Sequence, residues 1–340
     1  MSRIFITGID GVLGSTLATK LRARGHDVFG CSLAHSSDPR VIRGDVSKYR
    51  QLEQALDRYR SVFGSQSGNG DYDLLFHFAA EFGRKNGQAY YEDLWNTNCI
   101  GTRNVIEECT RREIPLVFSS SSEAYGLSEQ YNNGEALREE MLDNFPPQFH
   151  NEYALSKYTN ERQILTAARN SNLRAIILRF FNVYGPPERF TPYRSVVCQF
   201  AWKMLNNQTL TVNREGKRSH LWIGDWANTV SNIAAPGALQ TFFANPLRQW
   251  LGAGRTPNVP VFNVGGTEYE TIEGLYNRLH SLIPDYNGSL VTFIDKEEAN
   301  SATKEPDNTL ATIFLGHNPV RPLWEGLEET VNYLRSVMNS

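Results

Sequence analysis

The sequence predicts an α/β fold in which a doubly wound parallel sheet is followed by a smaller α/β lobe. Three observations support this prediction. Strand-like apolar runs alternate with amphipathic stretches through the first two-thirds of the chain, a glycine-rich turn joins the first strand to the first helix, and proline-rich turns appear after about residue 186. We therefore expect a large domain over residues 1–185 and a smaller lobe over residues 186–340 that is partly interwoven with it.

The strands of the large domain are expected where short β-branched or aromatic runs stand between turns. Helices are expected between them because apolar residues recur every three to four positions. Leu13, Leu17 and Leu21 form such a stripe before Gly25, a residue suited to end a helix, and a second stripe lies within residues 52–63. The expected strands are 4–7, 27–32, 41–46, 73–80, 114–120 and 175–185, with a polar loop at 64–71.

The smaller lobe has fewer regular signals. A helix is expected near residues 195–206, a short strand at 210–212 and a further helix from residue 225. Between that helix and the C-terminal part, residues 236–260 form a loose insert rich in proline and glycine. We expect this lobe to depend on the large domain for its stability.

Charge and composition narrow the classes of partner. The chain has a formal charge of −3, 21% charged residues and no long run of like charge, so neither nucleic acid nor a membrane surface is an expected partner. No window approaches about eighteen continuous apolar residues and the chain opens on a strand-like run, so the cytoplasm is the expected compartment. Four cysteines without a C-x-x-C pair and seven scattered histidines outline no metal site. The thiols are expected to be reduced and mostly buried.

The turn after the first strand reads TGIDGVLG and opens the first helix. Glycines at this point let the backbone turn tightly and approach a pyrophosphate, whose charge then faces the helix N-terminus. Such turns also arise for packing alone, but the position between strand and helix of a β-α-β run favours a bound dinucleotide. The residues expected to line this phosphate site are Gly8, Asp10, Gly11, Val12, Leu13 and Gly14.

The second strand departs from the usual pattern for NAD. Such a strand normally ends in an acidic residue that binds the ribose 2′-hydroxyl, whereas this one ends in Cys31 and Ser32. Ser32, His35, Ser36 and Arg40 could hold a 2′-phosphate, so the sequence favours NADP slightly over NAD. After the third strand, Asp45 and Val46 are expected beside the adenine, although Asp45 also suits an ordinary strand end.

Tyr153 and Lys157 stand four residues apart on a strongly helical stretch and so leave the same face of the helix. An ammonium near a phenol stabilises the phenolate and lowers the phenol's pKa, which turns tyrosine into a usable base near neutral pH. The same spacing is common on amphipathic helices, so it indicates catalysis only together with other motifs.

Taken in order, the motifs of this chain resemble those of the extended short-chain dehydrogenase/reductase family, in its nucleotide-sugar epimerase/dehydratase branch. The resemblance runs nearly end to end and implies a Rossmann-type sheet with a tightly bound nicotinamide dinucleotide. The motifs that carry it are the glycine turn, FHFAA (77–80 with Phe76), the serines of FSSSSEAYG, Tyr153 with Lys157, NTNCIGTRNVIE, RFFNVYGP, KRSHLWIGD, VFNVGG and PLWEGLEETVNYL.

The resemblance assigns roles to several side chains near the sugar. It implies that Ser121 hydrogen-bonds the sugar 4-hydroxyl, while Tyr153 takes the proton and hydride leaves C4 for the nicotinamide. The resulting 4-keto group acidifies the C3 and C5 hydrogens, and Glu123 stands where family dehydratases carry a catalytic glutamate. Hydride then returns to the sugar. The further cofactor contacts expected are Phe78, Ala79, Ala80, Asn98, Tyr153 and Lys157.

Ser122 is the informative departure from the family pattern. Dehydratases of the dTDP-glucose type carry an aspartate there as the acid for loss of the 6-hydroxyl, and serine is a poor general acid. The run Ser121-Ser122-Glu123 is more similar to that of UDP-glucuronate decarboxylases, while simple 4-epimerases usually lack the glutamate. Glu123 could therefore support epimerisation at C3 or C5, or orient the substrate.

Substrate contacts follow from the same resemblance. Asn182 and Arg218 match residues that hold the nucleotide diphosphate, which suits a planar guanidinium. Glu81, Arg84 and Arg194 lie in segments that flank the site in the family layout, and the two arginines could read a sugar carboxylate or an extra phosphate. Near the C-terminus, EPDNTLATIFLGHNP lacks an arginine and a tryptophan that the family often has. Helices around residues 90–112 and 153–170 match those of a homodimer interface.

Three functions remain open on the sequence. The first is a redox-neutral nucleotide-sugar enzyme, an epimerase before a dehydratase or decarboxylase. The second is a net oxidoreductase that consumes NAD(P)H, for example on a 4-keto sugar. The third is a non-catalytic dinucleotide sensor, which has no use for Tyr153, Lys157 and Ser121 together.

Overall fold

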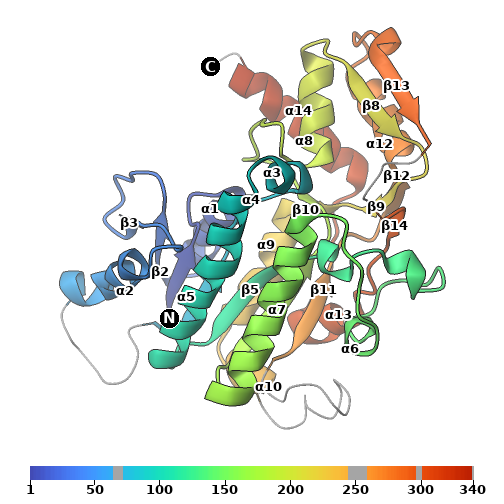
Figure 1. Cartoon of the computed structure of the whole chain (residues 1–340). Coiled ribbons are helices and arrows are strands. Elements are labelled where there is room, and N and C mark those ends of the chain that lie inside the picture. The colour runs from blue at the N-terminus through green and yellow to red at the C-terminus, as the bar shows by residue number, and fades with distance from the viewer. Residues whose placement is uncertain (64–71, 244–258, 296–300, 339–340) are drawn as a thin grey trace.

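The computed structural model describes residues 1–63, 72–243, 259–295 and 301–338. The polar loop expected at 64–71 and most of the insert expected at 236–260 lie outside these residues. Within them the molecule has a central sheet between two helical layers and a second, smaller cluster of helices and strands (Figure 1).

The central sheet has seven parallel strands in the order β11-β6-β5-β4-β1-β2-β3. The order in which strands are added reverses between β1 and β4, so the sheet is doubly wound as the sequence predicts. Six strands overlap the expected runs, and β11 is an addition beside β6. The strands are β1 (Arg3–Thr7), β2 (Asp27–Ser32), β3 (Val41–Arg43), β4 (Leu74–His77), β5 (Leu116–Ser121), β6 (Ala175–Phe180) and β11 (Val261–Val264).

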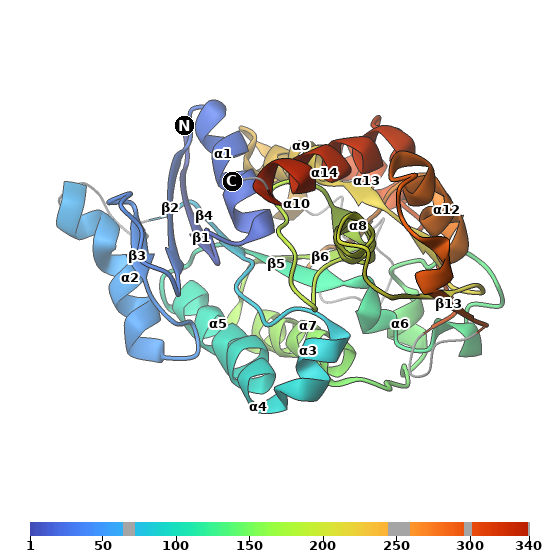
Figure 2. The same cartoon turned by 90° about the horizontal axis from the view of Figure 1, so that it is seen from above.

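Helices cover both faces of this sheet, which explains why its inner strands are apolar on both sides (Figure 2). One face packs against α2 (Tyr49–Phe63), α5 (Gly101–Arg111) and α7 (Glu152–Ser171). The other packs against α1 (Val12–Ala23), α9 (Ile223–Ser231), α10 (Ala238–Phe243) and α13 (Thr309–Leu315). The four cysteines are free and buried, as predicted.

Local signals account for the ends of the main helices. Leu17 and Leu21 are buried on α1, and Gly25 follows the helix with a φ of +82°, a conformation that suits glycine. Asn151 caps α7, where its Oδ1 accepts a hydrogen bond from the Ala154 N–H at 2.8 Å. The α7 cap fixes the start of the helix that carries Tyr153.

The smaller lobe has its own apolar core. It is built from α8 (Val196–Leu205), α12 (Ile272–Leu282) and α14 (Leu323–Met338) with the parallel pair β8 (Leu210–Asn213) and β13 (Val291–Ile294). The expected helix near 195–206 and strand at 210–212 are thereby confirmed. Figure 1 shows this lobe above the C-terminal ends of the central strands.

The lobe and the large domain are interwoven along the chain. Strand β11 and helices α9, α10 and α13 come after residue 185, yet they join the central sheet and its helical layer. We keep the division at residues 185 and 186 as a proposal. Two small sheets connect the parts: β7 (Val183–Tyr184) with β10 (Leu221–Trp222), and β9 (Lys217–Ser219) between β12 (Tyr269–Thr271) and β14 (Thr303–Lys304).

The remaining elements are short. The segment before α5 consists of α3 (Arg84–Ala89), α4 (Tyr91–Leu94) and a π-helical stretch (Trp95–Ile100). A further helix, α6, spans Met141–Asn144. The 3₁₀ turns are Ser122–Tyr125, Ser128–Gln130, Asn232–Ala234 and Gly288–Leu290.

A buried polar network joins α7 to the sheet. Arg179 on β6 pairs with Glu161 on α7, with Nη2 and Oε2 2.8 Å apart, and the two side chains are only 2% and 0% exposed. Ser120 Oγ donates to Glu161 Oε1 at 2.5 Å, and Arg179 Nη1 donates to the Tyr125 hydroxyl at 3.0 Å. The Tyr125 hydroxyl donates in turn to Asn263 Oδ1 on β11. Every charged group in this network therefore has several partners.

Candidate active site

The glycine turn lies where β1 ends, against the segment after β4. Gly8 has a φ of +69°, and a Cβ built on it would stand 2.8 Å from the Ala79 nitrogen. A Cβ on Gly14 would stand 2.2 Å from the Gly8 oxygen. Both positions therefore require glycine, because backbone occupies the space of a side chain.

The N-terminus of α1 offers donors to an anion. Gly11 is the N-cap, no side chain caps the helix, and no acidic residue stands in its first turn. The first α-helical bond runs from the Ser15 N–H to the Gly11 oxygen, so the amides of Val12, Leu13 and Gly14 precede the helical ladder. Such amides and the helix dipole favour a phosphate group, and this turn fits the pyrophosphate of a dinucleotide.

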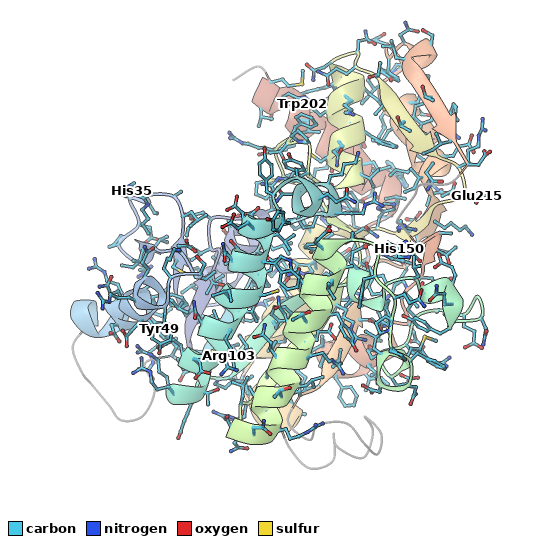
Figure 3. All side chains as sticks on the ribbon, viewed as in Figure 1. His35, Tyr49, Arg103, His150, Trp202 and Glu215 are labelled. Atoms are coloured by element: carbon cyan, nitrogen blue, oxygen red, sulfur yellow. The ribbon has the colours of Figure 1, made fainter. Side chains whose placement is uncertain are left out.

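The C-terminal ends of β2 and β3 form a second part of the sheet edge at which the glycine turn lies. Ser32 stands opposite Arg43 in the parallel register. Arg43 Nε donates to the Leu33 oxygen at 3.1 Å, and its Nη1 lies 3.3 Å from His35 Nε2. Arg40, by contrast, lies 4.0 Å from Asp27 at the other end of β2. Figure 3 shows His35 in the loop beyond β2.

Asp45 and Val46 lie just after β3, which ends at Arg43. The Asp45 Oδ1 accepts a hydrogen bond from the Ser47 N–H at 2.8 Å, which also suits the ordinary role of a turn-forming aspartate. Val46 is buried, and its carbonyl accepts a bond from Asn104 at 2.9 Å. A Cβ on Gly101 would stand 2.7 Å from the Val46 side chain, so the segment after β3 packs closely against α5.

The segment after β4 is fixed by hydrogen bonds to its neighbours. Phe78 and Ala79 bond to Thr7 through their N–H groups, and Ala80 follows them. Asn98, in the π-helical stretch, accepts from the Glu81 N–H at 2.8 Å and donates to the Glu81 carbonyl and to Ser156, each at 3.1 Å. A π-helical stretch often marks a functional site, because it displaces side chains from the regular helical positions.

His77 lies beneath this segment and is fully enclosed. Its two ring nitrogens lie 2.7 Å from the Thr7 hydroxyl and 3.0 Å from the Thr102 hydroxyl. Burial lowers the pKa of His77 to about 3, with a smaller contribution from the charge of Lys157. A neutral histidine bonded on both sides ties β1 and β4 to α5, which is a structural role.

Ser121, Tyr153 and Lys157 come together at the end of β5. Ser121 is the last residue of that strand, and its side chain hydrogen-bonds the Tyr153 phenol from α7. Lys157 Nζ donates to the Ser119 carbonyl at 2.8 Å and lies 5.8 Å from the centre of the Tyr153 ring. Tyr153 and Lys157 are both buried. The three side chains can act on one hydroxyl at this edge.

The electrostatics of Tyr153 differ from the expectation. Burial raises the pKa of the phenol, the hydrogen bond from Ser121 opposes this, and the charge of Glu123 raises the pKa further. Burial also lowers the pKa of Lys157 to about 8. The lowering of the Tyr153 pKa that the four-residue spacing predicts is thus wrong for this arrangement, because burial has the largest effect on this pKa.

Glu123 stands on the 3₁₀ turn that follows β5, next to the buried Ser122. Its Oε1 accepts a hydrogen bond from Lys304 Nζ on β14. Burial alone would raise the pKa of Glu123, but the charges of Lys304, Arg218 and Arg84 outweigh burial and lower it. Glu123 is therefore a carboxylate beside Ser121 and Tyr153.

Two of the five expected substrate residues, Arg218 and Asn182, hydrogen-bond to backbone carbonyls. Arg218, on β9, donates to the carbonyls of Lys217 and Ala302, each at 2.8 Å, and to that of Ser301 at 2.6 Å. Asn182 has a φ of +41°, and its amide donates to the Ser219 carbonyl. These two residues lie at the strand pairs that connect the lobe to the sheet.

The other three expected substrate residues lie in the two flanking segments. Glu81 Oε2 accepts from Asn86 at 2.6 Å, and Arg84 opens α3. Arg194 precedes the Ser195 cap of α8, and its Nε is buried without a hydrogen-bond partner among the described residues. Gly83 and Tyr193 approach closely, so the segments of Arg84 and Arg194 touch. The roles of all five residues stay predictions.

Two residues of the site were missed by the sequence analysis. Lys304 is separated from Glu123 by 181 positions. It directly precedes the segment EPDNTLATIFLGHNP, which the sequence analysis described only as lacking an arginine and a tryptophan. Arg43 could have been found, since parallel pairing of β2 and β3 places it beside Ser32. The strand periodicity of residues 41–46 carries that signal.

Some classes of site are absent from the described part of the chain. It contains no group of three or more His, Cys, Asp or Glu side chains placed to hold a metal ion. No helix in the same residues combines the length and the apolar character needed to cross a membrane.

Comparison with known proteins adds a family match. The model of the NAD dependent epimerase/dehydratase family matches residues 4–236. A UDP-N-acetyl-alpha-D-glucosaminuronate decarboxylase of Bacillus cytotoxicus is 24% identical over 348 aligned residues, which cover 99% of each chain. A UDP-glucuronic acid decarboxylase of Xenopus tropicalis is 24% identical and covers 98% of this chain and 72% of its own.

Solved structures share the fold. A UDP-glucose 4-epimerase of Thermus thermophilus, solved in complex with NAD, superposes with a TM-score of 0.75 at 21% identity, covering 98% of this chain and 99% of its own. A UDP-glucuronic acid 4-epimerase of Bacillus cereus, solved with UDP-glucuronic acid and NAD, gives a TM-score of 0.74 at 19% identity with the same coverage.

Proposed function

The chain belongs to the NAD-dependent epimerase/dehydratase family of enzymes, and from that premise we propose that it interconverts nucleotide sugars by transient oxidation at C4. The observation that carries the proposal is the group formed by Ser121, Tyr153 and Lys157 beside the carboxylate of Glu123. This group lies at the same edge of the sheet as the glycine turn, where dinucleotides and their substrates bind in open α/β sheets.

The bound nicotinamide dinucleotide supplies a hydride acceptor and returns the hydride at the end of the cycle. The chain's own residues handle the protons. Tyr153, hydrogen-bonded to Ser121, accepts the proton of the sugar 4-hydroxyl. Lys157, fixed by the Ser119 carbonyl, places its ammonium beside the phenol and stabilises the phenolate once it forms. Because burial raises the phenol's pKa, Tyr153 must first release its own proton to solvent, a step that the positive charge of Lys157 favours, before it can accept the proton of the sugar 4-hydroxyl.

Glu123 acts on the carbon next to the 4-keto group. As a carboxylate it can remove a proton from C3 or C5, whereas loss of water needs an acid. Ser122 is buried and cannot supply that acid. The site therefore favours epimerisation over dehydration.

A uronate-converting enzyme is the second candidate, and one observation favours it. The charges of Lys304, Arg218 and Arg84 all lower the pKa of Glu123, so the field at this carboxylate is positive. A positive field at the sugar end of the site suits a substrate with a carboxylate of its own. The two decarboxylases and the B. cereus epimerase are named for uronic acid sugars.

For the cofactor, we propose NADP rather than NAD. Ser32 stands where an NAD enzyme usually has an acidic residue, so no negative charge opposes a 2′-phosphate there. Arg43, rather than Arg40, stands beside Ser32, and His35 lies next to Arg43. A guanidinium at that point suits a 2′-phosphate. Fluorescence titration with NADPH and NADH should give tighter binding of NADPH.

A homodimer in the cytoplasm is the expected state. Ile100, beside α5, and Leu155, on α7, are 53% and 38% exposed, and both lie in the helices expected at the interface. Figure 1 shows α5 and α7 side by side. Analytical ultracentrifugation should find a dimer that Leu155→Glu weakens.

The test of function is a panel of UDP-, dTDP-, GDP- and CDP-sugars, uronates included, incubated with the holoenzyme and followed by mass and proton spectra. An epimer of unchanged mass in ordinary water supports the leading proposal, and loss of carbon dioxide supports the second. Loss of water, or stoichiometric consumption of NAD(P)H, contradicts both. Tyr153→Phe, which keeps the ring and removes the hydroxyl, should lower turnover by about 10²- to 10⁴-fold.

A further inference from the structure

Lys304 is a buried cation that the smaller lobe inserts into the candidate active site. It lies on β14, and its Nζ donates to Glu123 Oε1. The Lys304 side chain is only 1% exposed, while that of Glu123 is 24% exposed. The lysine thus lies behind the carboxylate, and the carboxylate faces the open side of the site.

The position of the ammonium is fixed by the backbone around it. Strand β14 pairs with β9, and Arg218 from β9 donates to the carbonyls of Ser301 and Ala302. On the other side, Glu129 accepts hydrogen bonds from the Ala302 and Thr303 N–H groups. These contacts hold the strand of Lys304 without any help from Glu123, so the cation is preorganised.

Glu123 is positioned from its own side as well. Its N–H donates to Ser121 Oγ at 3.2 Å, at the start of the 3₁₀ turn. Of its two carboxylate oxygens, Oε1 bonds to Lys304, and Oε2 has no hydrogen bond among the described residues. One oxygen is thus anchored and the other is available to a substrate.

We propose that Lys304 is a positioning residue that keeps Glu123 ionised and turns its second oxygen toward the sugar. This inference rests on the proposed function, in which Glu123 accepts a proton from the carbon beside the 4-keto group. In that step the C–H bond breaks, an O–H bond forms at Glu123, and the electron pair moves onto the keto oxygen. A carboxylate that was already protonated could not take part.

Other charged or titratable groups face Glu123 from each neighbouring element. The two arginines among them add to the field of Lys304, and none of these groups makes a hydrogen bond to the carboxylate among the described residues. These groups are Arg218 on β9, Arg84 on α3, Tyr153 on α7 and His150, which precedes α7 and lines the same cavity of about 10 Å³.

Carbon-13 NMR of the holoenzyme labelled at the glutamate side-chain carboxyl tests this role without any substrate. The Glu123 signal is assigned by its loss in Glu123→Gln. In the wild type its titration midpoint should lie below 4.5, the ordinary value for this carboxyl. Lys304→Met should raise that midpoint by at least about one pH unit, which is a tenfold change in proton affinity, and Lys304→Arg should restore most of the shift.

Glu129→Gln is the matched control. It weakens the anchoring of the same strand but leaves the ammonium in place, so the Glu123 midpoint should not move. An unchanged midpoint in Lys304→Met overturns the proposal, and so does an equal shift in Glu129→Gln, because the shift would then come from the fold of the segment.

A reciprocal variant keeps the proposal testable if Lys304→Met does not fold. In Glu123→Gln, nitrogen-15 NMR of the lysine amines should show the Lys304 midpoint falling, since its buried charge loses its partner; an unchanged midpoint contradicts the ion pair. The experiment also separates the two proposals. The expected titration without turnover of any nucleotide sugar means that the proposed function fails, whereas turnover with an unmoved titration removes only the role of Lys304.

Discussion

Two buried ion pairs flank the end of β5 and differ in how completely their charges are satisfied. Glu161 on α7 and Arg179 on β6 make further hydrogen bonds with Ser120 and Tyr125, and neither side chain is more than 2% exposed. Glu123 and Lys304 form the second pair, in which one carboxylate oxygen has no hydrogen bond among the described residues and the Glu123 side chain is 24% exposed. The enclosed pair has no capacity left for a ligand, and the open pair does.

The comparison separates scaffold from chemistry among residues of the same type. A buried charge with all its partners fixes the geometry of the elements it joins, here α7, β5, β6 and β11. A charge with one unused oxygen is poised to act on something else. The predictions below test this contrast.

Breaking the enclosed pair should have the largest effect on stability. Arg179→Met leaves the Glu161 carboxylate buried without its guanidinium, at a cost of about 3–5 kcal/mol in the free energy of unfolding. Urea unfolding followed by circular dichroism measures this. The double variant Glu161→Leu/Arg179→Met should recover much of the loss, and a single variant as stable as the wild type would contradict the scaffold role.

Breaking the open pair from the carboxylate side should mainly affect activity. Glu123→Gln keeps the shape of the side chain but cannot accept a proton, so kcat for the substrate identified by the panel should fall by about 10²-fold. The free energy of unfolding should change much less than in Arg179→Met. A variant with full kcat would show that Glu123 serves only to orient the substrate.

An exposed cation extends the comparison to the cofactor. Arg43→Met removes a guanidinium that makes no ion pair among the described residues, so stability should hardly change. The affinity for NADPH should fall by about tenfold, or about 1.4 kcal/mol, while that for NADH stays the same. Equal losses for both dinucleotides would argue against a 2′-phosphate contact.

The smallest expected effect is on the pH dependence of stability. The pKa of Glu123 is lower in the folded chain than its ordinary value of 4.5, so its ionised form adds stability above that value. This contribution is lost as pH falls through the lower folded-state pKa. Urea unfolding at pH 6 and at pH values below 4.5 should show the difference between wild type and Glu123→Gln shrinking on acidification. A difference that grows would reverse the sign of the shift.

The central sheet could be predicted from the sequence because its signals are local. Apolar runs mark its first six strands, and Gly8, Gly11 and Gly14 mark the turn at β1. The spacing of residues alone predicts the α7 helix and the placement of Tyr153 and Lys157 on one face of it. The family resemblance drawn from these motifs is confirmed by the match over residues 4–236.

Features that depend on tertiary contacts could not be predicted. Lys304 meets Glu123 only because β14 pairs with β9, and residues 181 positions apart leave no periodic signal. The pKa of Tyr153 depends on burial, which spacing does not report. Strand β11 was not expected because it has only four residues and lies far along the chain from β6, the strand with which it pairs.

The most direct test of the account is deuterium incorporation in heavy water. The holoenzyme and its Glu123→Gln variant are incubated with the nucleotide sugar that the panel identifies, and the sugar is followed by proton NMR. The account predicts deuterium at C3 or C5 with the wild type and about 10²-fold slower incorporation with the variant. Turnover by the wild type without deuterium at either carbon, or equal incorporation by both proteins, would contradict it.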